Sequence, residues 1–596
     1  MSESVTTPGA IPATEPRTAR RVIPNGVAVA LVALAAVVPF LPTLRAGFIY
    51  DDTTIVRDNA LLRGWSALAR VWSAPYWPTV GKDVGLYRPL HVALLAALWN
   101  LGGGSPGLFH LYAILLHLIV AVVLWRLLGV AVGRVAAIVG ALWFATHALH
   151  VETVASVANS SELLVALFTM ALGVVIVRAE RVQGAAREWG MALLAGALTV
   201  AAVYSKESGL LALPVAAVTA WGWRRATDAA SARSMLQRQM RLWVVCVAAL
   251  VVALIERAVV LGVSVAPAAI VAPGLDVMTP GTRIVAMLSL WPRIAGMLLW
   301  PTASLSPYYG PTILPDARAL RAVIAVLVTL ALVTLAIVAA RRGDRRPLVA
   351  VTWIALTYLP ASNLITSVGL FLADRTLLGP TVGVALALAW AIDVAAPRAR
   401  PLLVAACAVL VAHSAWVGFR YSVVWSSHRT LWERLVATSP TEYRGYQLLG
   451  IDAREHGDTA RALPLLARAF AMEPRDRRVR FEYGQVLFST ARYADAATVL
   501  APMLRDGDVR REPAFVAMYL EAVGRSRGAE GVVAAGTPLL RSEAAVVAAT
   551  YVGAAEEQLG RFAAADSVYG VGLRAQPGDS LLQARRAALE RRAASR

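Results

Sequence analysis

Long apolar runs alternate with short polar segments through the first two thirds of the chain. A helix needs about 20 mostly apolar residues to cross a bilayer, and the runs approach that length. We predict eleven crossings, at residues 25–45, 108–127, 134–149, 161–178, 189–205, 208–223, 242–263, 321–340, 347–362, 377–394 and 401–419. The pattern then changes to Ala- and Leu-rich helices with alternating charges. The sequence therefore predicts an all-α chain with a polytopic membrane bundle and a second helical domain.

Two further apolar runs do not fit as full crossings. They are residues 89–101, which follow Tyr87-Arg88-Pro89, and residues 283–302, which contain two Trp-Pro pairs. Counting either one alone would move later arginine clusters to the wrong side of the membrane. We expect both to be re-entrant or interfacial helices on the outer face, where Trp is common.

Arginine clusters between the crossings predict the orientation, because cytoplasmic loops are rich in Arg and Lys. With the N-terminus inside, the clusters fall at positions 17, 20 and 21; 126 and 134; 178, 181 and 187; 224, 225, 233, 238 and 241; 341, 342, 345 and 346; and 398 and 400. The C-terminus is then outside. The polar segments share this outer side, at residues 46–88, 147–160, 204–208, 264–282, 303–320 and 360–376.

Composition agrees with a membrane protein, since 58% of the 596 residues are hydrophobic and 16% are charged. The net charge of +19 does not indicate nucleic-acid binding, because the arginines follow the loops between apolar runs. Four regions follow. They are a disordered cytoplasmic tail (1–22), the membrane domain (23–430), its first outer loop with interfacial helices (46–107), and a repeat domain (431–596).

Two adjacent carboxylates, Asp51 and Asp52, come directly after the first crossing. Carboxylates this close to a membrane are costly unless they are used or paired. One of them can act as a general base that takes a proton from an acceptor hydroxyl. The alternative is the start of a solvated loop.

Three cationic positions on the outer side are candidates for binding phosphate. Arg88 begins an apolar helix, and Lys206-Glu207 and Asp374-Arg375 occupy two other outer turns. A guanidinium group matches phosphate oxygens. The alternatives are an interfacial arginine for Arg88 and structural ion pairs for the other two turns.

The third crossing ends in His147-Ala148-Leu149-His150-Val151-Glu152, and Glu162 begins the next helix. These residues resemble a metal-ligand cluster, but the spacing is no strong zinc signature. We expect contacts with acceptor or phosphate, or a purely interfacial role for the histidines. No metal or other cofactor is predicted, although a divalent metal is compatible with these residues.

A 34-residue period marks the last region. Leu449-Gly450, Ala462, Ala469 and Pro474 are followed 34 residues on by Tyr483-Gly484 and Ala496, and later by Gly553, Ala565, Tyr569 and Pro577. The pattern predicts about four tetratricopeptide repeats, the third degenerate, stacked as an α-solenoid. Such a solenoid offers a concave surface for a polypeptide.

The ordered set of motifs resembles a known family, from about residue 45 to the end. The set is Tyr50-Asp51-Asp52, Tyr87-Arg88-Pro89-Leu90, Phe109-His110, His147-x-x-His150-Val151-Glu152, Glu162-Leu163-Leu164, Lys206-Glu207 and Ala373-Asp374-Arg375. It is similar to the transmembrane and tetratricopeptide-repeat-containing O-mannosyltransferases, including bacterial relatives. The resemblance implies a GT-C fold, a dolichyl- or polyprenyl-phosphate sugar donor and inverting transfer. It also implies Asp51 or Asp52 as the base, Arg88 near the phosphate and Glu162 as a second acid.

The expected function is therefore transfer of a sugar, mannose or another hexose, from a polyprenyl-phosphate carrier to a protein hydroxyl on the outer face of a bacterial inner membrane. The expected partners are the donor, membrane lipid and a polypeptide acceptor or partner on the repeats. The main alternative is a membrane-anchored repeat scaffold without catalysis. A transporter would instead place charges near the bilayer midplane.

Overall fold

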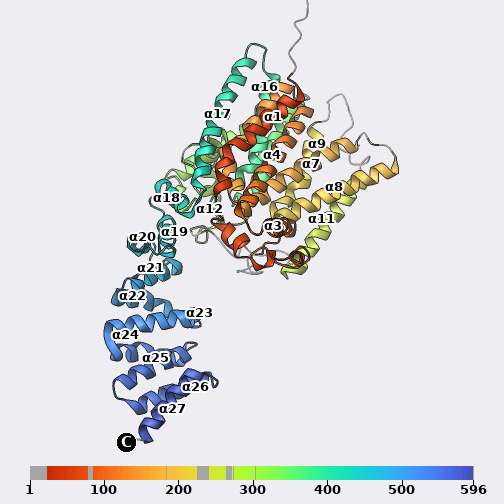
Figure 1. Cartoon of the computed structure of the whole chain (residues 1–596). Coiled ribbons are helices and arrows are strands. Elements are labelled where there is room, and N and C mark those ends of the chain that lie inside the picture. The colour runs from red at the N-terminus through yellow and green to blue at the C-terminus, as the bar shows by residue number, and fades with distance from the viewer. Residues whose placement is uncertain are drawn as a thin grey trace, which may run out of the picture.

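The structure is a computed structural model. It describes residues 23–594 except 78–84, 181, 183, 224–239, 263–271, 273 and 303. The predicted tail 1–22, part of the outer segment 264–282 and the arginines at 17, 20, 21, 181, 224, 225, 233 and 238 lie outside these residues. Figure 1 shows a helical bundle from which a curved rod of short helices extends to the C-terminus.

The bundle is built from helices throughout its described part. From the first crossing to the middle of the domain these are α1 (Asn25–Val37), η1 (Val38–Arg45), η2 (Thr53–Arg57), η3 (Ala60–Leu62), α2 (Ala67–Arg70), η4 (Val71–Ser73), α3 (Pro89–Gly102), α4 (Pro106–Ala131), α5 (Arg134–Ala145), η6 (Ala148–His150), α6 (Val151–Ala155), η7 (Val157–Ser160), α7 (Ser161–Ala179), α8 (Ala185–Ser205), η8 (Glu207–Leu211) and α9 (Ala212–Gly222). The rest are α11 (Met240–Leu261), α12 (Pro280–Ser289), α13 (Trp291–Leu299), η9 (Pro311–Ile313), α14 (Arg318–Arg341), α15 (Arg346–Tyr358), η10 (Leu359–Ala361), η11 (Asp374–Leu377), α16 (Leu378–Val394) and α17 (Arg400–Val424).

Nine helices of the described residues are long and apolar enough to cross a membrane, or ten if the bent pair Arg134–Ala145 and Ala148–Ala155 counts as one span. The chain is a multi-pass membrane protein by this measure. Each of the eleven expected crossings corresponds to a helix or a bent pair, but α9 and α15 are shorter than the others. The expected interfacial segment 89–101 is α3, which has 14 residues and is too short to span.

The short helices α9 and α15 nevertheless run between the two ends of the bundle. Ser208, just before α9, and Pro360, just after α15, line the same cavity as Asp51. At their other ends, the Arg345 guanidinium lies 4.7 Å from the centre of the Trp221 ring. We call these two ends the Asp51 end and the Arg345 end.

Helices α12 and α13 differ from these. The start of α12 and the end of α13 both contact the Asp51 end. Together they form an apolar stretch of 20 residues that is long enough to span. However, Arg283 donates to Ser367, which lies in the loop before Asp374, and His147 contacts the Leu298 carbonyl 3.0 Å away. These contacts place both ends of the stretch at one end of the bundle, and the two helices are not sharply bent against each other, which favours the expected interfacial helix.

The rod contains paired helices. They are α18 (His428–Thr438), α19 (Tyr443–Glu455), α20 (Thr459–Met472), α21 (Arg477–Ser489), α22 (Tyr493–Leu500), α23 (Gly507–Arg510), α24 (Pro513–Gly536), α25 (Ala545–Gln558), α26 (Phe562–Ala575) and α27 (Ser580–Ala594). Gly528 is non-helical (φ 67°, ψ −169°) and divides α24 into two helices, which form the third pair.

Glycines explain the close packing within three of these pairs. A side chain at Gly450 would meet Leu466, one at Gly484 would meet Leu500, and one at Gly553 would meet Tyr569. In each case the partner lies 16 positions later, on the second helix of the pair. The repeated contact is the physical basis of the 34-residue period. The predicted fold class, an all-α membrane bundle followed by a repeat solenoid, is confirmed.

Candidate functional site

A cavity of about 360 Å³ lies at the Asp51 end of the bundle. Its polar part gathers side chains from segments far apart in the sequence, namely Asp51, Arg88, Glu162, Lys206, Glu207 and Arg375. Its apolar part lies between α7, α9, α15 and α16, with Val165, Leu211, Val215, Trp353 and Leu378 in its walls. The cavity therefore joins a charged chamber to an apolar slot, which suits an amphiphilic ligand.

Asp51 is the cavity carboxylate without a partner. Among the described residues it accepts no hydrogen bond and forms no ion pair, whereas Glu162 and Glu207 are both paired. Burial raises the pKa of Asp51, and the Arg375 guanidinium opposes that shift. A free, partly dehydrated carboxylate facing a cavity has the properties of a general base.

Asp52 has a different environment although it is the next residue. It is buried, and its carboxylate accepts from the Ser156 hydroxyl and from the backbone N–H groups of Val157 and Ala158, at 3.0, 3.0 and 2.8 Å. Burial raises its pKa to about 7, and these hydrogen bonds oppose the shift. Asp52 does not line the cavity. It fastens the Asp51 loop to the segment before α7.

We expect Asp52→Asn to lower the free energy of unfolding by about 1–3 kcal/mol, because the amide presents one acceptor oxygen where the carboxylate presented two. Donor binding at the cavity should persist. Thermal unfolding of the purified protein measures the first effect. A destabilisation below about 0.5 kcal/mol, together with complete loss of donor binding, would contradict this structural role.

The remaining cavity charges form two ion pairs. Arg88 donates through Nε and Nη2 to Glu207, at 3.0 and 2.8 Å to Oε2, and Lys206 lies 2.6 Å from Glu162. The Arg88 guanidinium also lies 4.4 Å from the centre of the Tyr76 ring. Arg88 also lines the cavity, so its guanidinium is within reach of a ligand there. Lys206 therefore forms an ion pair, as one of the two alternatives expected. Its partner is Glu162 and not its neighbour Glu207.

Glu152, which does not line the cavity, holds Arg375 in place. Glu152 accepts from the Arg375 backbone N–H at 2.8 Å and also pairs with its guanidinium. The Glu152 side chain is 1% exposed, so this carboxylate supports Arg375 without reaching the cavity. Asp374 points away from the cavity and accepts from the Tyr309 hydroxyl at 2.8 Å. The structure thus brings Arg375 into the site and uses Glu152 to position it, while Asp374 binds Tyr309.

His147 and His150 are not part of the cavity, so the expected substrate contacts are not supported for either. Both are fully buried, and His147 contacts the Leu298 carbonyl while His150 bonds to His117 and to Thr381 at 3.1 and 2.8 Å. The helix η6 directs both rings into the bundle interior. Their polar atoms are used by protein groups there, which gives a structural role.

Sequence reasoning missed the contact between the repeat domain and the Asp51 loop. Tyr50 has a left-handed conformation (φ 54°), and its N–H donates to His428 Nε2 at 3.0 Å. Its ring packs edge-on against Trp432, with 5.3 Å between the centroids. Helix α18 therefore fixes the residue before Asp51. Spacing could not reveal this contact, because the partners are 378 positions apart.

Comparison with known proteins agrees with this architecture. A tetratricopeptide repeat family matches residues 453–512. The chain is 24% identical over 481 residues to human protein O-mannosyl-transferase TMTC3, across 76% of this chain and 52% of that protein. It is 33% identical over 194 residues to Drosophila melanogaster protein O-mannosyl-transferase Tmtc2, across 31% of this chain and 20% of the relative.

A similar match, 34% identity over 185 residues, links it to protein O-mannosyl-transferase Tmtc1 of Drosophila melanogaster. The chain spans about half the length, or less, of these curated relatives. The resemblance that the ordered motifs indicated is confirmed: this multi-pass membrane chain with a C-terminal tetratricopeptide repeat domain is similar to the protein O-mannosyl-transferases of the TMTC type.

Proposed function

We propose that the chain is an inverting membrane glycosyltransferase that moves a sugar, mannose or another hexose, from a polyprenyl-phosphate carrier to a hydroxyl of a polypeptide. The observation that carries the proposal is the unpaired carboxylate of Asp51 in one cavity with Arg88, Lys206 and Arg375. The similarity to protein O-mannosyl-transferases supports sugar transfer to protein.

The chemistry is a single displacement. Asp51 accepts the proton of the acceptor hydroxyl, and the oxygen forms a bond to the anomeric carbon of the sugar. The bond between that carbon and the phosphate oxygen breaks, and polyprenyl phosphate leaves with the bonding electrons. Arg88, Lys206 and Arg375 stabilise the negative charge on the departing phosphate. In this proposal side chains supply the positive charge, and no metal takes part.

The apolar slot supports a lipid donor. Val165, Val215 and Leu378 line the slot beside the charged chamber. A prenyl chain in this slot would leave water, while its phosphate stays beside the arginines. Burial of apolar chain contributes about 0.8 kcal/mol per CH₂ group. A soluble nucleotide sugar would gain nothing from these walls.

The repeat domain supports a polypeptide acceptor. It joins the bundle at the Asp51 end, where the Arg444 guanidinium lies 5.2 Å from the centre of the Tyr308 ring. In the proposed orientation the N-terminus is cytoplasmic, and the cavity and repeats are on the outer side of a bacterial inner membrane. A polypeptide on the solenoid would then reach the cavity without crossing the membrane.

Reconstitution tests the proposal. The full chain in proteoliposomes is given polyprenyl-phosphate [³H]mannose and a Ser/Thr-rich peptide, with a nucleotide-linked mannose as the control donor. We expect labelled peptide with the lipid donor alone. Labelled peptide with the nucleotide donor alone would overturn the donor class. Peptide binding to the repeats without transfer from any prenyl-linked hexose would favour a scaffold.

Arg88→Lys should raise the KM for the lipid donor about tenfold with a smaller change in kcat. Lysine keeps the charge beside Glu207 but loses the planar fork that matches phosphate oxygens. Initial rates against donor concentration measure this effect. Arg63→Lys is the matched control, since Arg63 belongs to the same loop but lies outside the cavity. Equal effects of the two variants would contradict a phosphate contact for Arg88.

The pH dependence of the transfer rate should follow the protonation of Asp51. Because burial raises the pKa of this carboxyl above its usual value of 3.8, protonation inactivates the base at a higher pH than for an exposed aspartate. Transfer is therefore full above this pKa and falls as the pH decreases through it. Measurement of kcat from pH 4 to 9 shows this decrease at low pH, the acid limb of the profile. Asp52→Asn should leave the limb in place, and its disappearance in that variant would assign it to Asp52.

A further inference from the structure

A second cavity, of about 810 Å³, opens at the Arg345 end of the bundle. It is larger than the Asp51 cavity and lies across the membrane domain from it. Helix α9 connects the two, because residues at its start line the Asp51 cavity and Trp223, just after its end, lines this one. The proposed transfer reaction makes no use of this second cavity.

Its polar lining is basic. Arg126 near the end of α4, Arg134 at the start of α5 and Arg178 near the end of α7 all line it, and no carboxylate does among the described residues. Within that part of the chain none of the three forms an ion pair. In contrast, Arg88 and Arg375 in the Asp51 cavity each face a glutamate. The uncompensated charge here favours an anionic ligand.

Two buried donors on the cavity wall lack acceptors among the described residues. They are Nε of Arg134 and Nε1 of Trp223. Arg134 does use Nη2, which donates to Asn25 at 2.6 Å. Buried N–H groups normally have an acceptor, because a buried donor without a hydrogen bond costs about 1–3 kcal/mol. Both side chains line the cavity, so a ligand there with acceptor oxygens would lie beside two N–H groups that lack acceptors.

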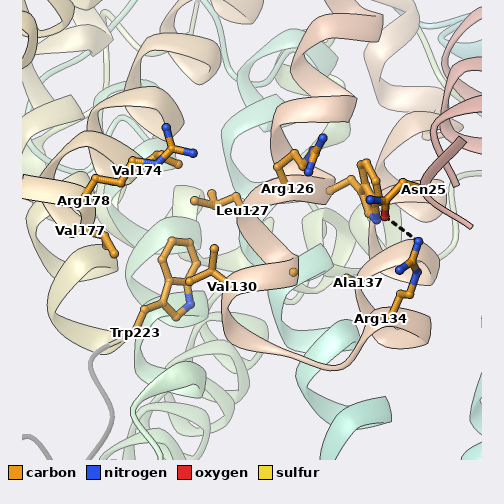
Figure 2. Close-up of a pocket in the computed structure, with 12 residues that line it drawn as sticks. Asn25, Arg126, Leu127, Val130, Arg134, Ala137, Val174, Val177, Arg178 and Trp223 are labelled. Carbon is orange, nitrogen blue, oxygen red and sulfur yellow. Dashed lines mark hydrogen bonds between the residues drawn. The ribbon is translucent and has the colours of Figure 1, made fainter. Parts of the chain in front are cut away.

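The walls between the basic groups are apolar. Figure 2 shows Arg178 and Trp223 on one side, Arg126, Asn25 and Arg134 on the other, and Leu127 and Val130 between them. A small soluble anion needs no such walls. An amphiphile does, since its head group meets the arginines while its chains cover the apolar surface.

We propose that this cavity binds an anionic phospholipid of the leaflet opposite the candidate active site. Its phosphodiester would accept from the arginines and from Trp223, and its acyl chains would lie along Leu127 and Val130. Basic pockets between membrane helices are suited to anionic head groups. The site is independent of the proposed transfer reaction.

Lipid binding to the purified full chain tests the proposal. Apparent Kd values are measured by native mass spectrometry with phosphatidylglycerol and phosphatidylcholine, and inorganic phosphate is added as a competitor. The cavity variant combines Arg126→Gln, Arg134→Gln and Arg178→Gln. The matched control combines Arg341→Gln, Arg342→Gln and Arg398→Gln, which removes the same charge from arginines that do not line the cavity.

We expect phosphatidylglycerol to bind at least roughly tenfold more tightly than phosphatidylcholine, and inorganic phosphate not to compete. The cavity variant should lose roughly tenfold or more in phosphatidylglycerol affinity, and the control less than about twofold. Trp223→Phe, which removes one N–H and keeps an aromatic ring, should weaken binding a few-fold even if the triple variant fails to fold.

Three results would overturn the proposal. Equal losses in the cavity and control variants would show general attraction between the membrane surface and arginine. Equal binding of the two lipids would remove the requirement for an anion. Competition by inorganic phosphate at the same concentrations as lipid would show a site for soluble anions.

Discussion

Replacement of Asp51 by asparagine is expected to lower the rate of sugar transfer by about 10²–10⁴-fold, the usual contribution of a general base. The amide has nearly the same shape but cannot accept the acceptor proton. Because the Asp51 carboxylate has no partner among the described residues, its removal breaks no contact there, so the fold should be unaffected. Single-turnover transfer in proteoliposomes measures the loss.

Two controls separate catalysis from folding in that experiment. Asp51→Asn should keep the donor affinity and the unfolding temperature of the parent protein. Asp52→Asn should do the reverse, with a lower unfolding temperature and transfer retained within about tenfold. Full activity of Asp51→Asn would end the assignment of Asp51 as the base. A loss confined to Asp52→Asn would move that role to its neighbour.

Glu152→Gln is expected to lower the free energy of unfolding by about 3–5 kcal/mol, the usual cost of removing one partner of a buried ion pair. Glu152 is 1% exposed and binds both the backbone and the guanidinium of Arg375. The substitution removes the counter-charge that is paired directly with that cation. Transfer should also fall, because Arg375 is no longer held against the cavity.

An exposed pair provides the matched control for this effect. Glu530 and Arg561 in the repeat domain are 63% and 48% exposed, so Glu530→Gln should change stability by less than about 1 kcal/mol. The double variant Glu152→Gln/Arg375→Gln should regain part of the lost stability but no transfer. Recovery of transfer in the double variant would show that Arg375 is structural only. Thermal unfolding and initial rates on the same samples distinguish these outcomes.

The repeat domain and the active-site loop are joined through Tyr50. Its left-handed backbone is unfavourable for a non-glycine residue and requires support from its surroundings. His428 and Trp432 on α18 provide that support. A physical route therefore exists by which a polypeptide on the solenoid would influence Asp51.

Local sequence patterns were enough to predict the helices, the two domains and the end of the bundle at which polar residues gather. These features depend on local properties: the length of an apolar run, the position of arginines between runs, and a 34-residue spacing of small residues. Arg88, Glu162, Lys206, Glu207 and Arg375 could therefore be placed together before any coordinates. The contacts of both ends of the α12–α13 stretch with the Asp51 end also agree with the pattern of later arginines.

Contacts between distant segments select which of these groups line the cavity. Asp51 and Asp52 share one local sequence, and they differ because Ser156, Val157 and Ala158, about a hundred residues later, bind the second one alone. His147 and His150 lie in a polar segment, yet η6 turns them into the interior toward Leu298, His117 and Thr381. A side chain's partners depend on which distant helices pack against it, and local sequence patterns do not specify that packing.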